Sequence, residues 1–184
     1  MSTIGGIPTL IGSAHTASNA TSVAITSGID STYDEYAFVY TDIGPATVDA
    51  HFGFQVNADG QSGYNEVITS SCVHGYAAEP SGSLDVAYDG AHDQAQGTAL
   101  QRLGSGIDNA AKYSAAGILL LFNPANTTYV THFSARTHFY EDDNSRSMFL
   151  AINGYINVTA AITDIEFKMS TGNFDGVIQM YGIA

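Results

Sequence analysis

The sequence predicts an all-β, single-domain protein: an antiparallel β-sandwich or jelly roll with a flexible N-terminal arm. Short segments in which apolar and polar residues alternate recur along the chain, and residues typical of turns separate them. No segment long enough for a helix shows a period near 3.6 residues. A chain of 184 residues can build one domain with a core. We therefore expect an extended arm over residues 1–18 and one β-sandwich domain over residues 19–184.

The arm is expected because residues 1–18 are uncharged and rich in Gly, Ser and Thr, with only a short extended piece around residues 9–11. The first three strands after it are predicted at residues 20–26, 35–42 and 47–57. In the second of these, Tyr36, Phe38 and Tyr40 occupy alternate positions. Successive side chains of a strand point to opposite faces, so these three rings share one face.

The third predicted strand has the clearest apolar face. Turn residues flank it, with Gly44-Pro45 before it and residues 57–60 after it. The apolar residues recur at every second position, as in a strand with one face against a core. The residues on this face are Val48, Ala50, Phe52, Phe54 and Val56.

The middle of the chain is the least regular part, and the C-terminal part is clearer. Residues 79–113 are rich in Gly, Ala, Ser and Asp, a composition that favours long exposed loops. The last strand is apolar on both faces, which indicates a strand with a neighbour on each side. The remaining strands are predicted at residues 65–77, 84–88, 98–103, 115–122, 128–140, 148–157, 162–169 and 176–183.

The composition is acidic and poor in charge. Charged residues make up 12% of the chain, about half the usual share. Five Lys and Arg residues face eighteen Asp and Glu residues, which gives a net charge of −13. Proteins that bind nucleic acid need clustered basic residues, so we expect no nucleic-acid partner. Anionic membrane surfaces would repel the chain, so we expect no membrane partner either. The uncharged surface favours packing against other protein copies.

Cysteine usage and the N-terminal sequence indicate synthesis in a reducing cytoplasm. Cys72 is the single cysteine, so an intramolecular disulfide and a cysteine-rich zinc site are both excluded. The first residues lack the basic and apolar segments of a signal peptide. The longest apolar run, residues 117–122, has the length of a strand and is far shorter than a membrane-spanning helix.

No catalytic site is predicted. Cys72 and His74 share a strand face, but a nucleophile and base also need an orienting third group. The chain has no Gly-x-Ser-x-Gly, His-Glu-x-x-His or phosphate-binding glycine motif. Eighteen acidic residues leave room for a pair of glycosidase carboxylates, but no pair lies in an apolar setting that would raise a pKa.

No cofactor is predicted, and calcium is the cation that the acidic loops would suit. Calcium takes oxygen ligands, which two loops supply. The metal candidates are Asp59, Glu66, Asp142 and Asp143. His132 and His138 lie on one strand face, but six residues along a strand span about 20 Å, too far for one ion. That face is expected to be a polar strip turned to solvent or to a neighbouring subunit.

Aromatic residues outside the strand faces are candidates for stacking on a glycan or a partner. Sugar rings and partner side chains pack against flat aromatic faces. These residues lie in or near predicted loops: Tyr33, Tyr64, Tyr76, Tyr88 and Tyr113.

Four segments resemble a group of uncharacterised virion structural proteins from phages of marine bacteria and cyanobacteria. They are SGIDSTYDEYAFVYTDIGPAT, FGFQVNADGQSGYNEVITSS, NPANTTYVTHF and AITDIEFKMSTGNFDGVIQMYGI. The similarity spans roughly residues 5–183, and it is strongest in IDSTYDEY and NFDGVIQMYGI. These segments carry no catalytic residues. The resemblance therefore implies a place in a phage particle and no reaction.

The function that this implies is capsid decoration. Phage decoration proteins commonly form trimers over the capsid lattice and use an arm to tie capsid subunits together, so the expected partners are further copies of the chain and the major capsid protein. The expected location is the virion surface. The residues expected to contact the capsid are Ile4, Pro8, Leu10 and Ile11. Tyr36, Phe38 and Tyr40 are expected in the core or at a trimer axis.

Two alternatives stay open. The closing hairpin is similar to the ends of some phage fibre modules, which implies a tail-fibre or receptor-binding module that contacts host glycans. The third hypothesis is an enzyme that acts on polysaccharides, which would need one essential carboxylate.

Overall fold

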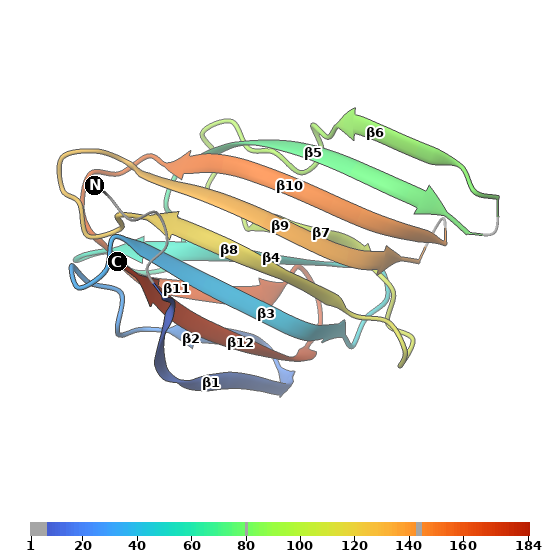
Figure 1. The fold of residues 1–184 in the computed structure, drawn as a ribbon, viewed down its shortest axis with the longest axis horizontal. Coiled ribbons are helices and arrows are strands. Elements are labelled where there is room, and N and C mark those ends of the chain that lie inside the picture. Colours follow the sequence, from blue (N-terminus) through green and yellow to red (C-terminus); the bar gives the residue numbers. More distant parts are fainter. Residues whose placement is uncertain (1–6, 80, 143–144) are drawn as a thin grey trace.

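The computed structural model describes residues 7–79, 81–142 and 145–184, and its described part confirms the predicted all-β, single-domain fold (Figure 1). Every strand pairing is antiparallel. The strands are β1 (Thr9–Ala20), β2 (Ser22–Ile25), β3 (Glu35–Pro45), β4 (Ala50–Ala58), β5 (Ile68–Ala78), β6 (Leu84–Tyr88), β7 (Gln101–Ile107), β8 (Ala115–Phe122), β9 (Thr131–Glu141), β10 (Arg146–Ile156), β11 (Ile162–Met169) and β12 (Phe174–Ile183).

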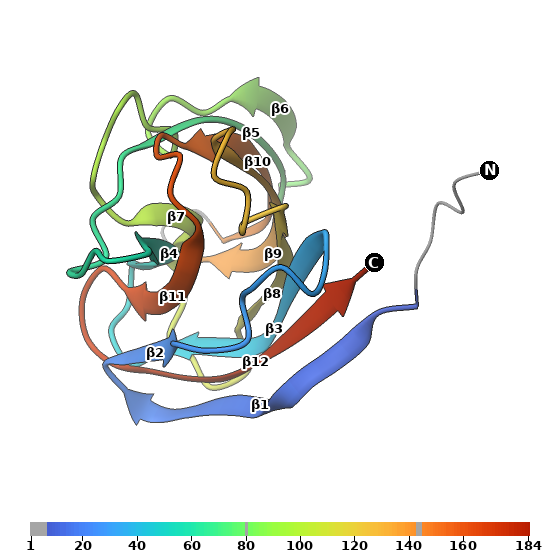
Figure 2. The ribbon, with the colours of Figure 1, turned by 90° about the vertical axis from the view of Figure 1, so that its left-hand side faces the viewer.

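The strands form two facing layers. The first layer has the order β1-β12-β3-β8-β9-β10-β5-β6, and the second has the order β7-β4-β11-β2. Figure 2 shows the first layer descending from β6 to β1, with the second layer beside it. The layers join where Ile107 of β7 pairs with Glu141 of β9. Only Thr21 separates β1 from β2 at the opposite margin, so the two layers form one nearly closed sheet.

Aromatic side chains from both layers meet in the core. Phe38 of β3 lies 5.7 Å from Phe167 of β11, measured between ring centroids. Phe54 of β4 and Phe133 of β9 make an edge-to-face pair at 5.3 Å. All four rings are buried. Such pairs favour offset or edge-on geometry, so they fix how the layers lie on each other.

Tyr40 brings a hydroxyl group into this aromatic core, and the hydroxyl is paired. Its oxygen lies 2.5 Å from Oγ1 of Thr137 on β9, and both residues are buried. Burial raises the pKa of the Tyr40 hydroxyl well above its ordinary range. The group therefore stays neutral and adds a directional contact to the packing.

The second face of β4 is also buried, because loops cover it. The Gln55 Nε2 donates to the carbonyl oxygens of Glu66, Thr98 and Ala99. Asn57 Oδ1 accepts the backbone N–H of Tyr64. Buried amides that satisfy loop carbonyls hold these connections against the strand. The alternation of apolar residues in the sequence identifies the inner face of β4. It does not reveal that loops cover the opposite face.

The N-terminal segment differs from the expected arm. Residues 9–18 belong to β1, which pairs with β12 from Thr9↔Gly182 to Ala20↔Phe174. Its small polar residues show little alternation because both of its faces are largely exposed. Backbone pairing with β12 holds this strand in place, and Ala17 is the one residue of the strand that is buried. Of the expected arm, only residues 7 and 8 lie outside β1 in the part of the chain that the structure describes.

Several strand boundaries also differ from the expected ones. Strand β4 begins at Ala50, so Val48 lies before it and is 44% exposed instead of facing the core. Strand β7 begins at Gln101, later than the alternation predicts. Strand β12 has β1 and β3 on its two sides, as its apolar character indicates.

Replacing Phe52 by Ala should strongly destabilise the fold. Phe52 is fully buried and contacts the rings of Tyr40, Phe167 and Phe174. Removing such a ring leaves a cavity and costs about 3–5 kcal/mol in the free energy of unfolding. Urea unfolding followed by circular dichroism measures this loss.

The control is Tyr129→Ala, which removes a ring that is 72% exposed. It should change the free energy of unfolding by less than about 0.5 kcal/mol. Equal losses in the two variants would contradict the described core.

Candidate functional site

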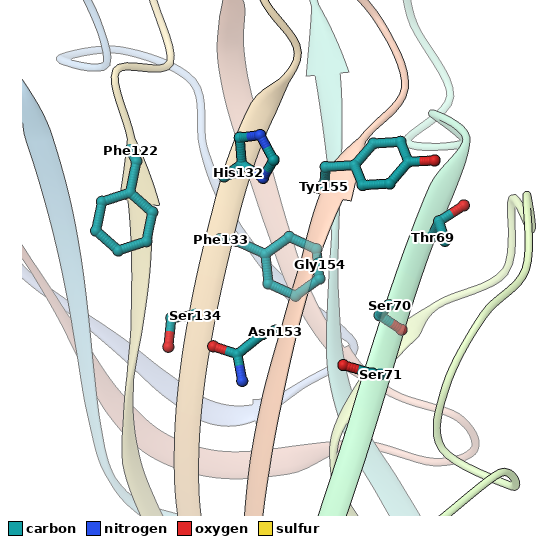
Figure 3. Close-up of a pocket in the computed structure, with 10 residues that line it drawn as sticks. All are labelled: Thr69, Ser70, Ser71, Phe122, His132, Phe133, Ser134, Asn153, Gly154 and Tyr155. Atoms are coloured by element: carbon teal, nitrogen blue, oxygen red, sulfur yellow. The ribbon is translucent and has the colours of Figure 1, made fainter.

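An open groove crosses the outer face of the first layer over β8, β9, β10 and β5 (Figure 3). Its volume is about 640 Å³. The ring of Phe133 reaches the floor of the groove, where Gly154 has no side chain. A Cβ atom at Gly154 would lie 2.7 Å from Phe133 Cζ, so glycine is required for this close approach.

Antiparallel register brings the groove residues into two straight rows. In the first row Phe122 pairs with His132, which pairs with Tyr155, which pairs with Thr69. The rings of His132 and Tyr155 lie 6.1 Å apart. This row presents three flat rings from three neighbouring strands.

The second row lies two residues further along each strand and is more polar. Leu120 pairs with Ser134, which pairs with Asn153, which pairs with Ser71. Figure 3 shows Ser134, Asn153 and Ser71 side by side below the rings of the first row. Two hydroxyls and one amide can each donate and accept hydrogen bonds.

Gln96, from the loop after β6, fixes the first row. Its Nε2 donates to Oγ1 of Thr69 at 2.6 Å and to the hydroxyl oxygen of Tyr155 at 3.3 Å. Its Oε1 accepts from Nδ2 of Asn157 at 2.7 Å. The backbone N–H of Gln96 also donates to Thr69. One side chain therefore ties β5, the end of β10 and a loop together beside the groove.

A second hollow continues from the first past the start of β9. It has a volume of about 550 Å³ and shares Phe122 and His132 with the groove. The loop before β9 lines most of the rest, with Asn126 and the exposed Tyr129, and Thr159 completes the lining. The Asn126 side chain accepts the backbone N–H groups of Thr128 and Tyr129, which orders this loop.

The opposite end of the same outer face is apolar. The register places Val86 beside Gly75 and Phe149, and Tyr88 beside Val73. Leu84 lies two residues before Val86 on the edge strand β6. Leu84 and Val86 are each 76% exposed. We name these residues the apolar edge strip: Val73, Leu84, Val86, Tyr88 and Phe149.

Cys72 and His74 do not form a nucleophile and base. The Nδ1 atoms of His74 and His92 lie 2.9 and 2.6 Å from Oδ2 of Asp89, so His74 is turned to that carboxylate. Cys72 is fully buried, and burial, with the negative charges of Asp89 and Asp93, raises the pKa of its thiol to about 12. The thiol therefore stays protonated and inert near neutral pH.

The residues expected to contact a capsid lie in two different places. Pro8 and Leu10 are exposed at the start of β1, whereas Ile11 packs partly against the core. Ile4 lies outside the described residues. Tyr36, Phe38 and Tyr40 are fully buried between the layers, so they belong to the core and reach no subunit contact.

The five tyrosines expected to stack on a glycan or partner lie outside the groove. Tyr33 packs edge-on against Tyr36, and the Tyr113 ring stacks on Tyr140 at 3.8 Å. Arg146 covers the ring of Tyr76.

The remaining two tyrosines lie at different places on the surface. Tyr64 is half-buried in the loop after β4, and Tyr88 is 60% exposed in the apolar edge strip, where its hydroxyl donates to Asp93. The aromatic rings that line the groove belong to different residues: Phe122, His132 and Tyr155.

The acidic metal candidates are dispersed. Asp59 is exposed at a turn, and Oε1 of Glu66 accepts the backbone N–H of Ala58. Asp142 lies in the turn after β9, and Asp143 lies outside the described residues. Within residues 7–79, 81–142 and 145–184, no group of three or more His, Cys, Asp or Glu side chains is arranged to hold a metal ion.

Comparison of the chain with protein-family models, curated proteins and solved structures finds no match. In the described part of the chain, no helix is long and apolar enough to span a membrane.

Replacing Asp89 by Asn should weaken the acid dependence of stability. Burial raises the pKa of Asp89, but the two imidazoles that face its carboxylate outweigh this and hold the pKa below its ordinary value. The ionised form therefore contributes stability above about pH 4, and this contribution is lost as the pH falls through the folded-state pKa.

Urea unfolding between pH 7 and pH 2 measures this dependence. The variant should be less stable than the native protein at pH 7, and it should lose less stability below pH 4. Parallel curves for the two proteins below pH 4 would show that Asp89 is not a source of the acid dependence.

Proposed function

We propose that this chain is a non-enzymatic virion structural protein of a phage, a decoration protein that oligomerises on the capsid surface. The observation that supports this most is the apolar edge strip. Its five residues account for more than half of the large apolar side chains that are exposed in the described chain. A large exposed apolar surface on a folded protein typically marks an interface with another protein.

The free edge of β6 strengthens this argument. Sheet proteins usually protect an edge strand with charges, proline or a covering loop, because an open edge pairs with other chains. Strand β6 carries only one charged residue, Asp85, whose Oδ1 accepts the backbone N–H of Val86. Leu84, Val86 and Tyr88 stay exposed beside it. The edge and the strip together suit a partner that adds both backbone and apolar contacts.

The other free edge of the first layer supports contact with the capsid. Ile7 and Leu10, at the start of β1, are 90% and 48% exposed. Burial of such side chains gains about 25 cal/mol per Å² of apolar surface. The first layer thus has exposed apolar side chains at both margins, one for the shell and one for a neighbouring copy.

A second function, a tail-fibre or receptor-binding module that contacts host glycans, is favoured by a separate observation. The groove over β8, β9, β10 and β5 combines flat rings with hydroxyl and amide groups. Binding a glycan there needs no catalytic residue, and it is compatible with a position on the head or on the tail.

Replacing both Leu84 and Val86 by Asp should abolish self-association and weaken attachment to phage heads at least tenfold. The two charges would have to be buried without a partner in the interface, at a large desolvation cost. Both side chains are exposed, so the variant should fold. Sedimentation velocity measures self-association, and co-sedimentation with heads that lack the protein measures attachment.

The matched control replaces the exposed loop residues Gln61 and Ser62 by Asp, which adds the same charge away from both edges. The control should assemble like the native protein. If the Leu84→Asp, Val86→Asp variant self-associates and attaches to heads as the native protein does, the apolar edge strip is not the interface.

A further inference from the structure

We propose that the groove over β8, β9, β10 and β5 binds an uncharged oligosaccharide. This inference specifies the ligand of the second proposed function, and it does not depend on the decoration role. The ligand class follows from the lining, from the unpaired polar groups and from the charge of the protein.

The lining residues provide the two kinds of contact that a neutral sugar offers. The C–H face of a sugar ring is apolar and packs on aromatic rings, which Phe122, His132 and Tyr155 supply. The hydroxyls of a sugar need groups that both donate and accept, which Ser134 and Asn153 supply in the adjacent row. No Asp, Glu, Lys or Arg lines the groove.

The polar groups of the second row are free to bind a ligand. Within the described residues, the side chains of Ser71, Ser134 and Asn153 make no hydrogen bond to the rest of the chain. The polar groups at the end of the first row are instead fixed, because Gln96 holds Thr69 and Tyr155. A platform that is held in place while its hydrogen-bonding groups stay unpaired loses little entropy when a ligand binds.

The dimensions of the groove suit more than one sugar ring. Its rows cross four adjacent strands, a width of about 14 Å at the usual spacing of about 4.8 Å between strands. Beyond Phe122 and His132 the second hollow continues toward Tyr129. A linear chain therefore has space to extend past the first row of rings.

The charge of the protein disfavours acidic saccharides. The net charge is −13, and the nearest cation on this face, Arg136, lies in the next row, where it pairs with Ile118 and Ala151. Uronate or sialate groups would meet repulsion from the whole molecule without a charged partner in the groove. Neutral sugars avoid this cost.

The test is isothermal titration calorimetry of the full chain with maltohexaose, cellohexaose and mannohexaose, and with a hyaluronan hexasaccharide as the acidic comparison. At least one neutral probe should bind, and the acidic one should not. Asn153→Ala should weaken that binding about fivefold, as expected for one lost hydrogen bond. Tyr155→Ala should weaken it more than Tyr155→Phe, because only the first loses the ring.

The matched control is Gln61→Ala, which removes an exposed amide far from the groove and should leave the affinity unchanged. Circular dichroism verifies that each variant is folded. The inference is overturned if no neutral probe binds, if only the acidic probe binds, or if Asn153→Ala leaves the affinity unchanged. Saccharide binding by a protein that does not attach to heads would reject the decoration role and leave the groove assignment intact.

Discussion

The register of β9 with its neighbours is the constraint on which the rest of the structure depends. Strand β9 pairs with β10 from Thr131↔Ile156 to Glu141↔Arg146, with β8 along much of its length, and with β7 at its end. Because side chains alternate, this register turns Phe133 and Phe139, with Ala135 and Thr137 between them, into the core. Ser134, Arg136 and His138 point outward. A slip of one residue would exchange the two faces. The core, the groove and the junction between the layers are thus set by one backbone pairing.

The outer face of the first layer is divided along its strands. One end carries rings and neutral polar groups around His132, and the other carries exposed apolar side chains around Val86. Aromatic rings beside unpaired serine and asparagine side chains suit a hydrated, uncharged ligand. The apolar end instead suits a contact with protein from which water is excluded. The two ends lie on the same sheet without sharing residues. An assembly role and a binding role therefore do not compete for the same surface.

Most of the fold could be predicted from the sequence, whereas the site could not. Alternation identifies buried strands such as the one around Phe52, because one face must be apolar. It does not identify β1, which is held by backbone pairing, or the covered second face at Gln55. The polar face of His132 and Ser134 is visible in the sequence. Its neighbours Asn153 and Ser71 become visible only when long-range register aligns three strands.

We propose that this protein lies on the surface of a phage head, and immunogold labelling is the sharpest test of that position. An antibody against the chain would be applied to intact phage particles, and the particles would be imaged by electron microscopy. If the protein decorates the capsid, gold should spread over the icosahedral head. Gold confined to the tail, or absent from particles, would contradict the decoration role.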